Sequence, residues 1–336
     1  MQTKNLRLLL DDQPSYRKKQ INKLIWHDFI DSWEKATNLP ETLRKKLEKH
    51  CSLEIKAKIS QSPGADKALI ELNDKNKIET VLIKTKKRNT VCLSSQAGCA
   101  LGCSFCATGK MGFKRNLTTK EILLQVLFWS RVLKKQNQKV NNLVFMGMGE
   151  PFLNYENTLQ AVRFINQPEY FNIGARKISI STCGIVPGIE KLAKEDLQIN
   201  LAVSLHAPNN KLRNKLMPIN KKYPLEKLFQ VTDNYIKITN RKVMLEYLLL
   251  NKVNDQTKHA EQLAKLIKNK KLYMVNLVEY NATGQYEKSP NLDKFKNILQ
   301  DKGLETAERK SPGENIQAAC GQLVVKKIND LPKNGK

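Results

Sequence analysis

The stretch SSQAGCALGCSFCATGKMGF, residues 94–113, carries three cysteines with the spacing C-x3-C-x2-C. Thiolates at such spacing are typical ligands of zinc or of an iron–sulfur cluster. A closed structural site usually draws its fourth ligand from a second Cys or His pair, and the sequence shows no such pair. The three cysteines therefore favour a [4Fe–4S] cluster with one iron open to a substrate. A structural zinc with a remote ligand is the alternative.

Short apolar runs alternate with helical patterns from about residue 90 onward. The runs TVCLSS, NNLVFMGM, KISISTC, INLAVSLHA, KVMLEYLLL and YMVNLVEYN read as strands. The segment TTKEILLQVLFWSRVL after the cysteines reads as a helix with a capping box from Thr118 to Glu121. This alternation predicts an α/β fold with a parallel sheet whose active site lies at the strand carboxyl ends. About six βα units are present, fewer than a closed eight-stranded barrel needs.

The segment before the cysteines has a different pattern. Residues 1–60 read as basic helices, and ALIEL and IETVLI flank NDKNK as a β-hairpin. We therefore expect an N-terminal helical accessory domain over 1–60 and a linker with a hairpin over 61–88. The catalytic core is expected over 89–325, and a basic tail over 326–336.

The composition indicates a nucleic-acid partner. Lys and Arg number 58 against 32 acidic residues, a net charge of +26. Such a charge attracts polyanions, and RNA is the favoured partner. Solvated lysine faces are the alternative explanation of the charge.

The sequence has no apolar run near the length of a membrane span, and the apolar stretch at its start is too short for a secretory signal. We therefore expect a cytoplasmic protein. Seven cysteines in such a protein favour metal or redox chemistry over a disulfide scaffold.

The cysteine stretch resembles the signature of radical S-adenosylmethionine (SAM) enzymes. Further segments are similar to those of the RlmN/Cfr family of RNA adenine methyltransferases, in the same order over about residues 12–325: SYRKKQINKLIW, FMGMGEPFLN, SISTCGIVPGI, LAVSLHAPNN, LMPINKKYP and AACGQL. This resemblance implies a partial (βα)6-type radical SAM barrel with an accessory domain.

The resemblance implies a ligand set for each cofactor. The cluster ligands would be Cys99, Cys103 and Cys106, and the methionine moiety of SAM would complete the coordination of the open iron. The implied SAM contacts are Gly149, Glu150, Ser181, Ser204, Leu205, His206 and Asn281.

The resemblance also implies roles for two isolated cysteines. Cys320 would receive a methyl group from one SAM, and a second SAM would be cleaved to activate that methyl group. The methyl carbon would then join adenine in a covalent protein–RNA adduct. Cys92 would release the product by forming a disulfide with Cys320, and Glu79 would remove the proton from the base. The basic run 84–88 departs from the family pattern after Glu79, and Cys51 and Cys183 match no role and are expected to be structural.

The motifs GEPFLN and LAVSLHAPN favour the family members that methylate C2 of adenine. The implied substrates are an adenosine in the peptidyl-transferase region of 23S rRNA and the adenosine 3′ to the anticodon of tRNA. A reduced flavodoxin or ferredoxin is the expected electron donor, and a monomer is the expected state. Two alternatives stay open: methylation at C8, and a non-catalytic RNA-binding protein with a structural metal.

Overall fold

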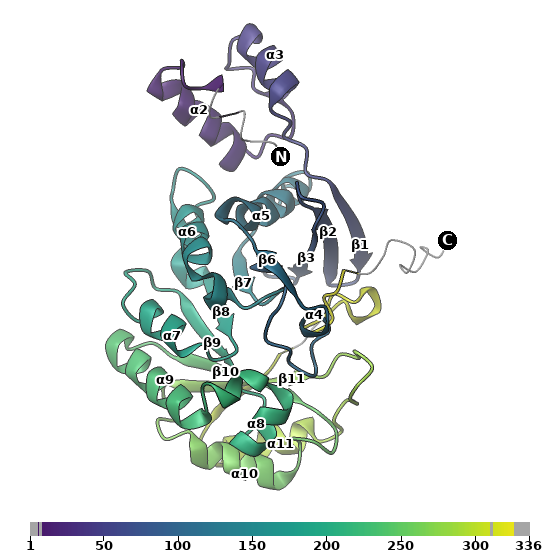
Figure 1. The fold of residues 1–336 in the computed structure, drawn as a ribbon, viewed down its shortest axis with the longest axis vertical. Coiled ribbons are helices and arrows are strands. Elements are labelled where there is room, and N and C mark those ends of the chain that lie inside the picture. The colour runs from purple at the N-terminus through teal and green to yellow at the C-terminus, as the bar shows by residue number, and fades with distance from the viewer. Residues whose placement is uncertain (1–5, 7–8, 310–311, 326–336) are drawn as a thin grey trace.

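The computed structural model describes residues 6, 9–309 and 312–325. Its centre is a ten-stranded sheet in the order β1-β2-β3-β4-β7-β8-β9-β10-β11-β12 (Figure 1). From β4 onward every neighbouring pair is parallel, which confirms the α/β class and gives a mixed sheet with three antiparallel strands at its start. The parallel strands are β4 (Asn89–Cys92), β7 (Asn142–Phe145), β8 (Ile178–Thr182), β9 (Asn200–Ser204), β10 (Val243–Leu249), β11 (Tyr273–Glu279) and β12 (Glu305–Arg309).

Helices connect these strands and lie on the outer face of the curved sheet (Figure 1). They are α5 (Thr119–Lys134), α6 (Tyr155–Asn166), α7 (Val186–Leu192), α8 (Asn210–Leu216), α9 (Leu225–Thr239), α10 (Thr257–Leu266) and α11 (Leu292–Asp301). The predicted capping box at the start of α5 is confirmed: Thr118 accepts from the Glu121 amide, and the Glu121 carboxylate accepts from the Thr118 amide at 2.9 Å. The strands are mostly buried, because the helices cover one side and loops fill the other.

Three antiparallel strands precede the parallel part: β1 (Ala57–Ser62), β2 (Ala65–Glu71) and β3 (Lys77–Lys84). The hairpin of β2 and β3 was predicted, whereas β1 was not, because AKISQS is largely exposed and lacks a regular apolar alternation. Strand β3 pairs with β4, and Val81 lies opposite Cys92. The segment expected as a linker thus extends the main sheet, and the domain boundaries given above stay predictions.

The N-terminal helices α2 (Ser15–Trp26) and α3 (Glu41–His50) form a lobe beyond the ends of α5 and α6 (Figure 1). The Trp26 ring packs edge-on against Phe164 of α6, with ring centroids 5.4 Å apart. The buried Arg131 of α5 donates to the carbonyls of Leu53 and Ile30. These contacts fix the lobe to the catalytic part of the chain. The predicted tail 326–336 lies outside the described residues.

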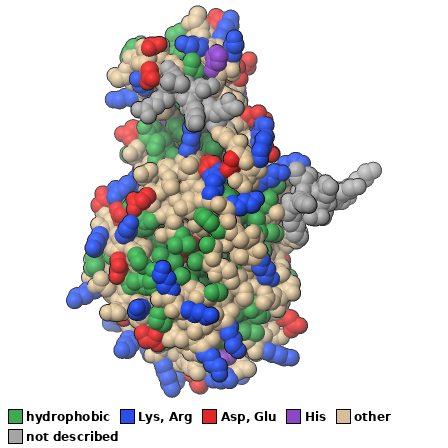
Figure 2. Space-filling view, in the orientation of Figure 1, with side chains coloured by type: hydrophobic (Ala, Val, Ile, Leu, Met, Phe, Trp, Pro, Cys, Tyr) green, Lys and Arg blue, Asp and Glu red, His purple; other side chains and the backbone are tan. Residues whose placement is uncertain are grey.

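The surface is rich in basic side chains. On the face in Figure 2, Lys and Arg side chains are distributed over both the N-terminal lobe and the main body, with acidic residues between them. Within the described part of the chain, no helix has the length and apolar character to cross a bilayer.

Candidate active site

One cavity collects residues from the carboxyl ends of the parallel strands. Most contributions lie at or just after the end of a strand, as expected for a barrel of βα units, and Glu246 lies in the middle of β10. The cavity is lined by Cys92 of β4, Gly149 and Glu150 after β7, Ser181 of β8, Ser204 and His206 at the end of β9, Glu246 of β10, Tyr280 after β11 and Arg309 of β12. The cysteine stretch and Cys320 close it from the loop side.

The three cysteines of the opening motif all line this cavity. Burial raises the pKa of the Cys99 thiol to about 12, and that of Cys106 is also raised, mainly by burial. Such thiols ionise only beside a strong positive charge, which a metal centre supplies. Among the described residues, no three His, Cys, Asp or Glu side chains converge closely enough for a single metal ion. Thiols spread around one cavity suit a polynuclear cluster, whose cysteine ligands bind different irons.

The cysteine stretch is held by a small hairpin of β5 (Gln96–Gly98) and β6 (Phe113–Asn116), with the short helix α4 (Ala107–Lys110) between them. Gly98 has φ +82°, and a Cβ atom there would lie 2.0 Å from the Gly112 carbonyl oxygen. The hairpin therefore closes only with glycine at this position.

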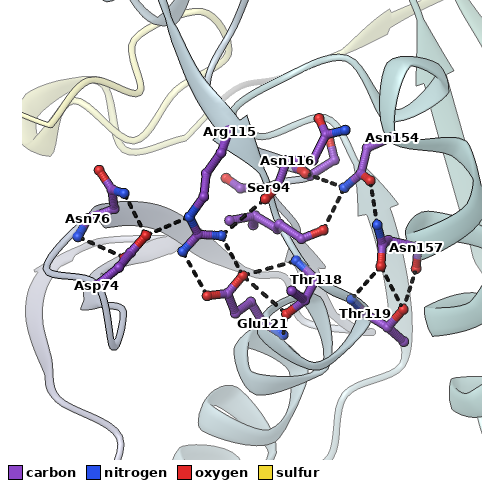
Figure 3. A network of polar contacts seen from close by, with 12 residues as sticks. Asp74, Asn76, Ser94, Arg115, Asn116, Thr118, Thr119, Glu121, Asn154 and Asn157 are labelled. Atoms are coloured by element: carbon purple, nitrogen blue, oxygen red, sulfur yellow. Dashed lines mark hydrogen bonds and ion pairs between the residues drawn. The ribbon is translucent and has the colours of Figure 1, made fainter.

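A polar network anchors β6 from two sides (Figure 3). The Arg115 guanidinium donates to both Glu121 carboxylate oxygens, at 2.8 and 2.9 Å, and to Asp74 in the β2–β3 turn at 2.6 Å. Arg115 also lowers the pKa of Asp74. Asn154 donates to the carbonyls of Ser95, just before β5, and Leu117, just after β6, so it holds the two chain segments together at the open end of the hairpin. The network ties the cysteine stretch to α5 and to the antiparallel strands, so its backbone is pre-organised for cluster binding.

The predicted SAM-binding pair follows β7. Gly149 has φ +96°, and a Cβ atom there would lie 2.5 Å from the Gln96 side chain. The buried Glu150 carboxylate accepts from the amides of Cys183 (2.7 Å) and Phe152 (3.0 Å), and its pKa is raised by burial. Ser181 and Ser204 also line the cavity, whereas Leu205 is buried. The structure therefore places a carboxylate and two hydroxyls around the same space.

Cys320 lies in the segment that follows the last strand. The Gly321 carbonyl accepts from the Ala107 amide at 2.8 Å, directly after Cys106, and Thr108 donates to the Leu323 carbonyl at 2.6 Å. Asn281, predicted to contact SAM, donates to the Cys320 carbonyl at 3.1 Å. These bonds hold Cys320 against the cysteine stretch.

Cys92 and Cys320 line the cavity together and interact electrostatically. Burial raises the pKa of the Cys92 thiol to about 12. Both cysteines are free thiols in the structure, so the implied disulfide stays a prediction.

Comparison with known proteins agrees with this geometry. The radical SAM superfamily profile matches residues 93–266. A probable dual-specificity RNA methyltransferase RlmN from Dictyoglomus thermophilum is 47% identical over 317 residues, covering 93% of this chain and 91% of the relative. The corresponding protein from Spiroplasma citri is 44% identical, with the same coverage.

A solved structure gives the same result in three dimensions. The crystal structure of a radical SAM methyltransferase from Sphaerobacter thermophilus superposes with a TM-score of 0.90, at 41% identity and with 95% of each chain covered. The chain belongs to the RlmN family. Membership in this radical SAM family implies a [4Fe–4S] cluster and SAM, and the donor set described above fits both.

In this RlmN family member, the side chain of Glu79 forms a buried ion pair. Lys67 Nζ lies 2.8 Å from Glu79 Oε1, with both side chains about 95% buried. The other Glu79 oxygen accepts from the Val324 amide at 2.9 Å, and Lys67 also donates to the Gln317 carbonyl at 3.2 Å. Residues 317 and 324 flank Cys320, so the pair anchors both ends of the Cys320 segment. Glu79 is on the same sheet face as Val81 and Cys92.

Sequence reasoning missed two further residues at this RlmN-family site. Cys183, expected to be structural, lines the cavity beside Cys103, and the Cys103 side chain together with burial raises the pKa of the Cys183 thiol. The fully buried Arg213 donates to the carbonyls of Cys183, Ser204 and Leu205, at the ends of β8 and β9. No motif marked Arg213, because a single arginine in a short helix reads as a solvated charge. Its buried position shows that it fixes the strand ends around the cavity.

His206 is held neutral. Its Nδ1 accepts from the Leu248 amide at 3.0 Å, which leaves the proton on Nε2, and its ring packs edge-on against Phe105. Burial, assisted by the Arg213 charge, lowers the pKa of His206 to about 3. The His206 backbone has φ +56°, a left-handed conformation that is uncommon for a residue other than glycine.

This pKa predicts a pH-dependent loss of stability. As pH falls, the unfolded chain protonates His206 first, near 6.5, so stability present above that pH is lost between about 6.5 and 3. The loss is about 1.4 kcal/mol per pH unit in that window. Between pH 7.0 and 5.5 the wild type should lose about 1 kcal/mol more than His206→Gln in urea unfolding. Equal losses in the two proteins would contradict a neutral His206.

Proposed function

We propose that this protein methylates adenine C2 in RNA, with 23S rRNA and tRNA as substrates, in the cytoplasm. Homology to RlmN supports an RNA methyltransferase. The observation that carries the finer proposal is that Cys92, Cys320 and the three cluster cysteines line one cavity. A methyl carrier, a resolving thiol and a cluster site are thus within reach of one substrate base.

Cys99, Cys103 and Cys106 would hold the [4Fe–4S] cluster, and Glu150 would accept from the ammonium of SAM. When bound and reduced by a flavodoxin or ferredoxin, the cluster supplies the electron that cleaves SAM to a hydrogen-abstracting radical.

The Cys320 thiolate first attacks the methyl group of one SAM. A sulfur–carbon bond forms as the sulfonium–methyl bond breaks, so S-adenosylhomocysteine leaves with the electron pair. The radical would then take a hydrogen atom from the S-methyl group of Cys320, and the resulting carbon radical would add to adenine C2. Loss of one electron to the cluster and of the C2 proton to Glu79 would leave a methylene bridge between the Cys320 sulfur and C2. The Cys92 thiolate would attack that sulfur, the sulfur–carbon bond would break, and the carbon would take the electron pair and a proton. An external dithiol would reduce the resulting Cys92–Cys320 disulfide.

Exposed cations lie in the turn between β3 and β4, where Lys86, Lys87 and Arg88 are all exposed. This turn is at the amino end of β4, whereas Cys92 is at the carboxyl end of that strand. These cations would therefore contact backbone phosphates of the RNA at a distance from the reacting base. Because the cavity is enclosed by strand ends, the target base must leave its stack to enter it.

Product analysis tests the proposal. RNA from reaction with the reconstituted enzyme is digested to nucleosides and resolved by mass spectrometry against authentic standards. We expect 2-methyladenosine, together with a Cys320 peptide carrying the added mass of one methylene. If 8-methyladenosine is found instead, the enzyme methylates adenine at C8 and the proposed C2 specificity is wrong. No methylated nucleoside and an unmodified Cys320, in protein with an intact cluster, would contradict a methyltransferase.

A further inference from the structure

Arg309 has a position that the family comparison does not explain. It ends β12, where it pairs in parallel register with Val278 of β11. Among the described residues that line the cavity, Arg309 is the only Arg or Lys. Its side chain is 23% exposed, so most of the guanidinium lies in the cavity wall. A lone cation in such a place has an electrostatic effect on its neighbours much larger than a surface charge has.

Side chains on the two preceding strands orient this guanidinium. Arg309 Nη1 lies 3.3 Å from Glu246 Oε2 of β10. The other Glu246 oxygen accepts from Asn276 Nδ2 of β11 at 3.0 Å. Glu246 and Asn276 face each other in the β10–β11 register, and Arg309 lies on the same face two positions further along, opposite Val278, so its guanidinium reaches back to Glu246. These contacts fix Arg309 at the strand ends rather than in solvent.

The guanidinium interacts electrostatically with both Cys320 and Cys92. Besides those thiols and the cluster cysteines, the titratable side chains of the cavity wall are Glu150, Cys183, His206, Glu246 and Tyr280. None of these supplies a positive charge at neutral pH, because His206 is neutral. Burial, and to a lesser degree the nearby Cys320, raises the pKa of the Cys92 thiol. Arg309 is therefore the cation of the described cavity wall that interacts with Cys320 and Cys92, whereas the Arg213 charge behind the wall interacts with Cys183 and Cys103.

The geometry points to Arg309 as the positioning residue that stabilises the thiolate of Cys320 for methyl transfer and that of Cys92 for release of the product. The role in turnover rests on the proposed function of these two cysteines. Only a thiolate attacks a sulfonium methyl group or a thioether-bound sulfur at a useful rate. Methyl transfer discharges the Cys320 thiolate to a neutral thioether, which leaves Arg309 free to stabilise the remaining Cys92 thiolate.

The test measures thiol ionisation rather than turnover. The full-length enzyme is produced without iron and reconstituted with iron and sulfide in the absence of SAM, so that Cys320 stays a thiol. Iodoacetamide alkylation of Cys320 is followed by peptide mass spectrometry from pH 6 to 10 in wild type, Arg309→Gln and Arg309→Lys. We expect the midpoint to rise by about one pH unit or more in Arg309→Gln, which slows alkylation about tenfold at pH 7.5. Arg309→Lys, which keeps the charge, should lie closer to the wild type.

Cys51 in the N-terminal lobe serves as the internal control, because faster alkylation there reports general loosening of the protein. An unchanged Cys320 midpoint in Arg309→Gln would overturn the inference, as would an Arg309→Lys midpoint shifted as far as that of Arg309→Gln. The alkylation profile needs neither SAM nor RNA. A shifted midpoint in an enzyme that never methylates Cys320 would therefore refute the proposed function alone.

Discussion

Cys320→Ala should abolish RNA methylation, and Cys92→Ala should leave the protein covalently attached to its RNA. Without the Cys320 sulfur there is no methyl carrier, so the rate should fall on the order of a thousandfold or more. Without Cys92 the cavity still holds the cluster cysteines and Cys320, so the adduct forms, whereas the thiol proposed to resolve it is missing. Both variants should keep their cluster, because neither residue belongs to the C-x3-C-x2-C motif.

The measurement combines two assays on the same samples. Methyl transfer from labelled SAM to RNA reports turnover, and denaturing gel electrophoresis with labelled RNA reports the adduct. Cys51→Ala is the matched control, since Cys51 is a free, buried cysteine of the N-terminal lobe, away from the cavity lining. It should keep its rate within about twofold. Methylation by Cys320→Ala at the control rate would remove the carrier role, and free product at normal yield from Cys92→Ala would remove the resolving role.

Lys67→Met should be the most destabilising change in the antiparallel strands. Lys67 and Glu79 are both buried and 2.8 Å apart, so the substitution removes the Lys67 charge from beside a buried carboxylate. Breaking such a pair costs about 3–5 kcal/mol, whereas replacing both partners by apolar residues is close to neutral. We therefore expect Lys67→Met/Glu79→Leu to recover most of the free energy of unfolding. The comparison is made by urea unfolding at pH 7.

The same variants separate stability from catalysis. If Glu79 is the base, the double variant regains stability and stays inactive, whereas a purely structural pair would allow activity to return with stability. Lys45→Met is the control, because Lys45 and Glu41 form an exposed i,i+4 pair that contributes at most about 0.5 kcal/mol. A loss of less than about 1 kcal/mol in Lys67→Met would mean that the pair is not needed to hold the Cys320 segment.

Local sequence signals predicted much of the fold. The alternation of apolar strands and helices located the parallel strands, and NDKNK located the β2–β3 turn, because both patterns depend on neighbours in the chain. Strand β1 was missed because its exposed residues carry no such pattern. It forms because β2 presents an unpaired edge, which is a property of the folded sheet.

The motif alone predicted the cluster site, since the three thiols come from one loop, and the structure places all three around one cavity. The sequence by itself also indicated Cys92 and Cys320, through resemblance, and the strand-end residues Gly149, Glu150 and Ser204. Only the tertiary structure decided that Lys67 pairs with Glu79, that Arg213 fixes the strand ends and that Arg309 faces the two thiols. The physical reason is burial. A lone Lys or Arg has no periodicity or spacing to mark it, and its role appears only when strands distant in sequence enclose its charge beside a specific partner.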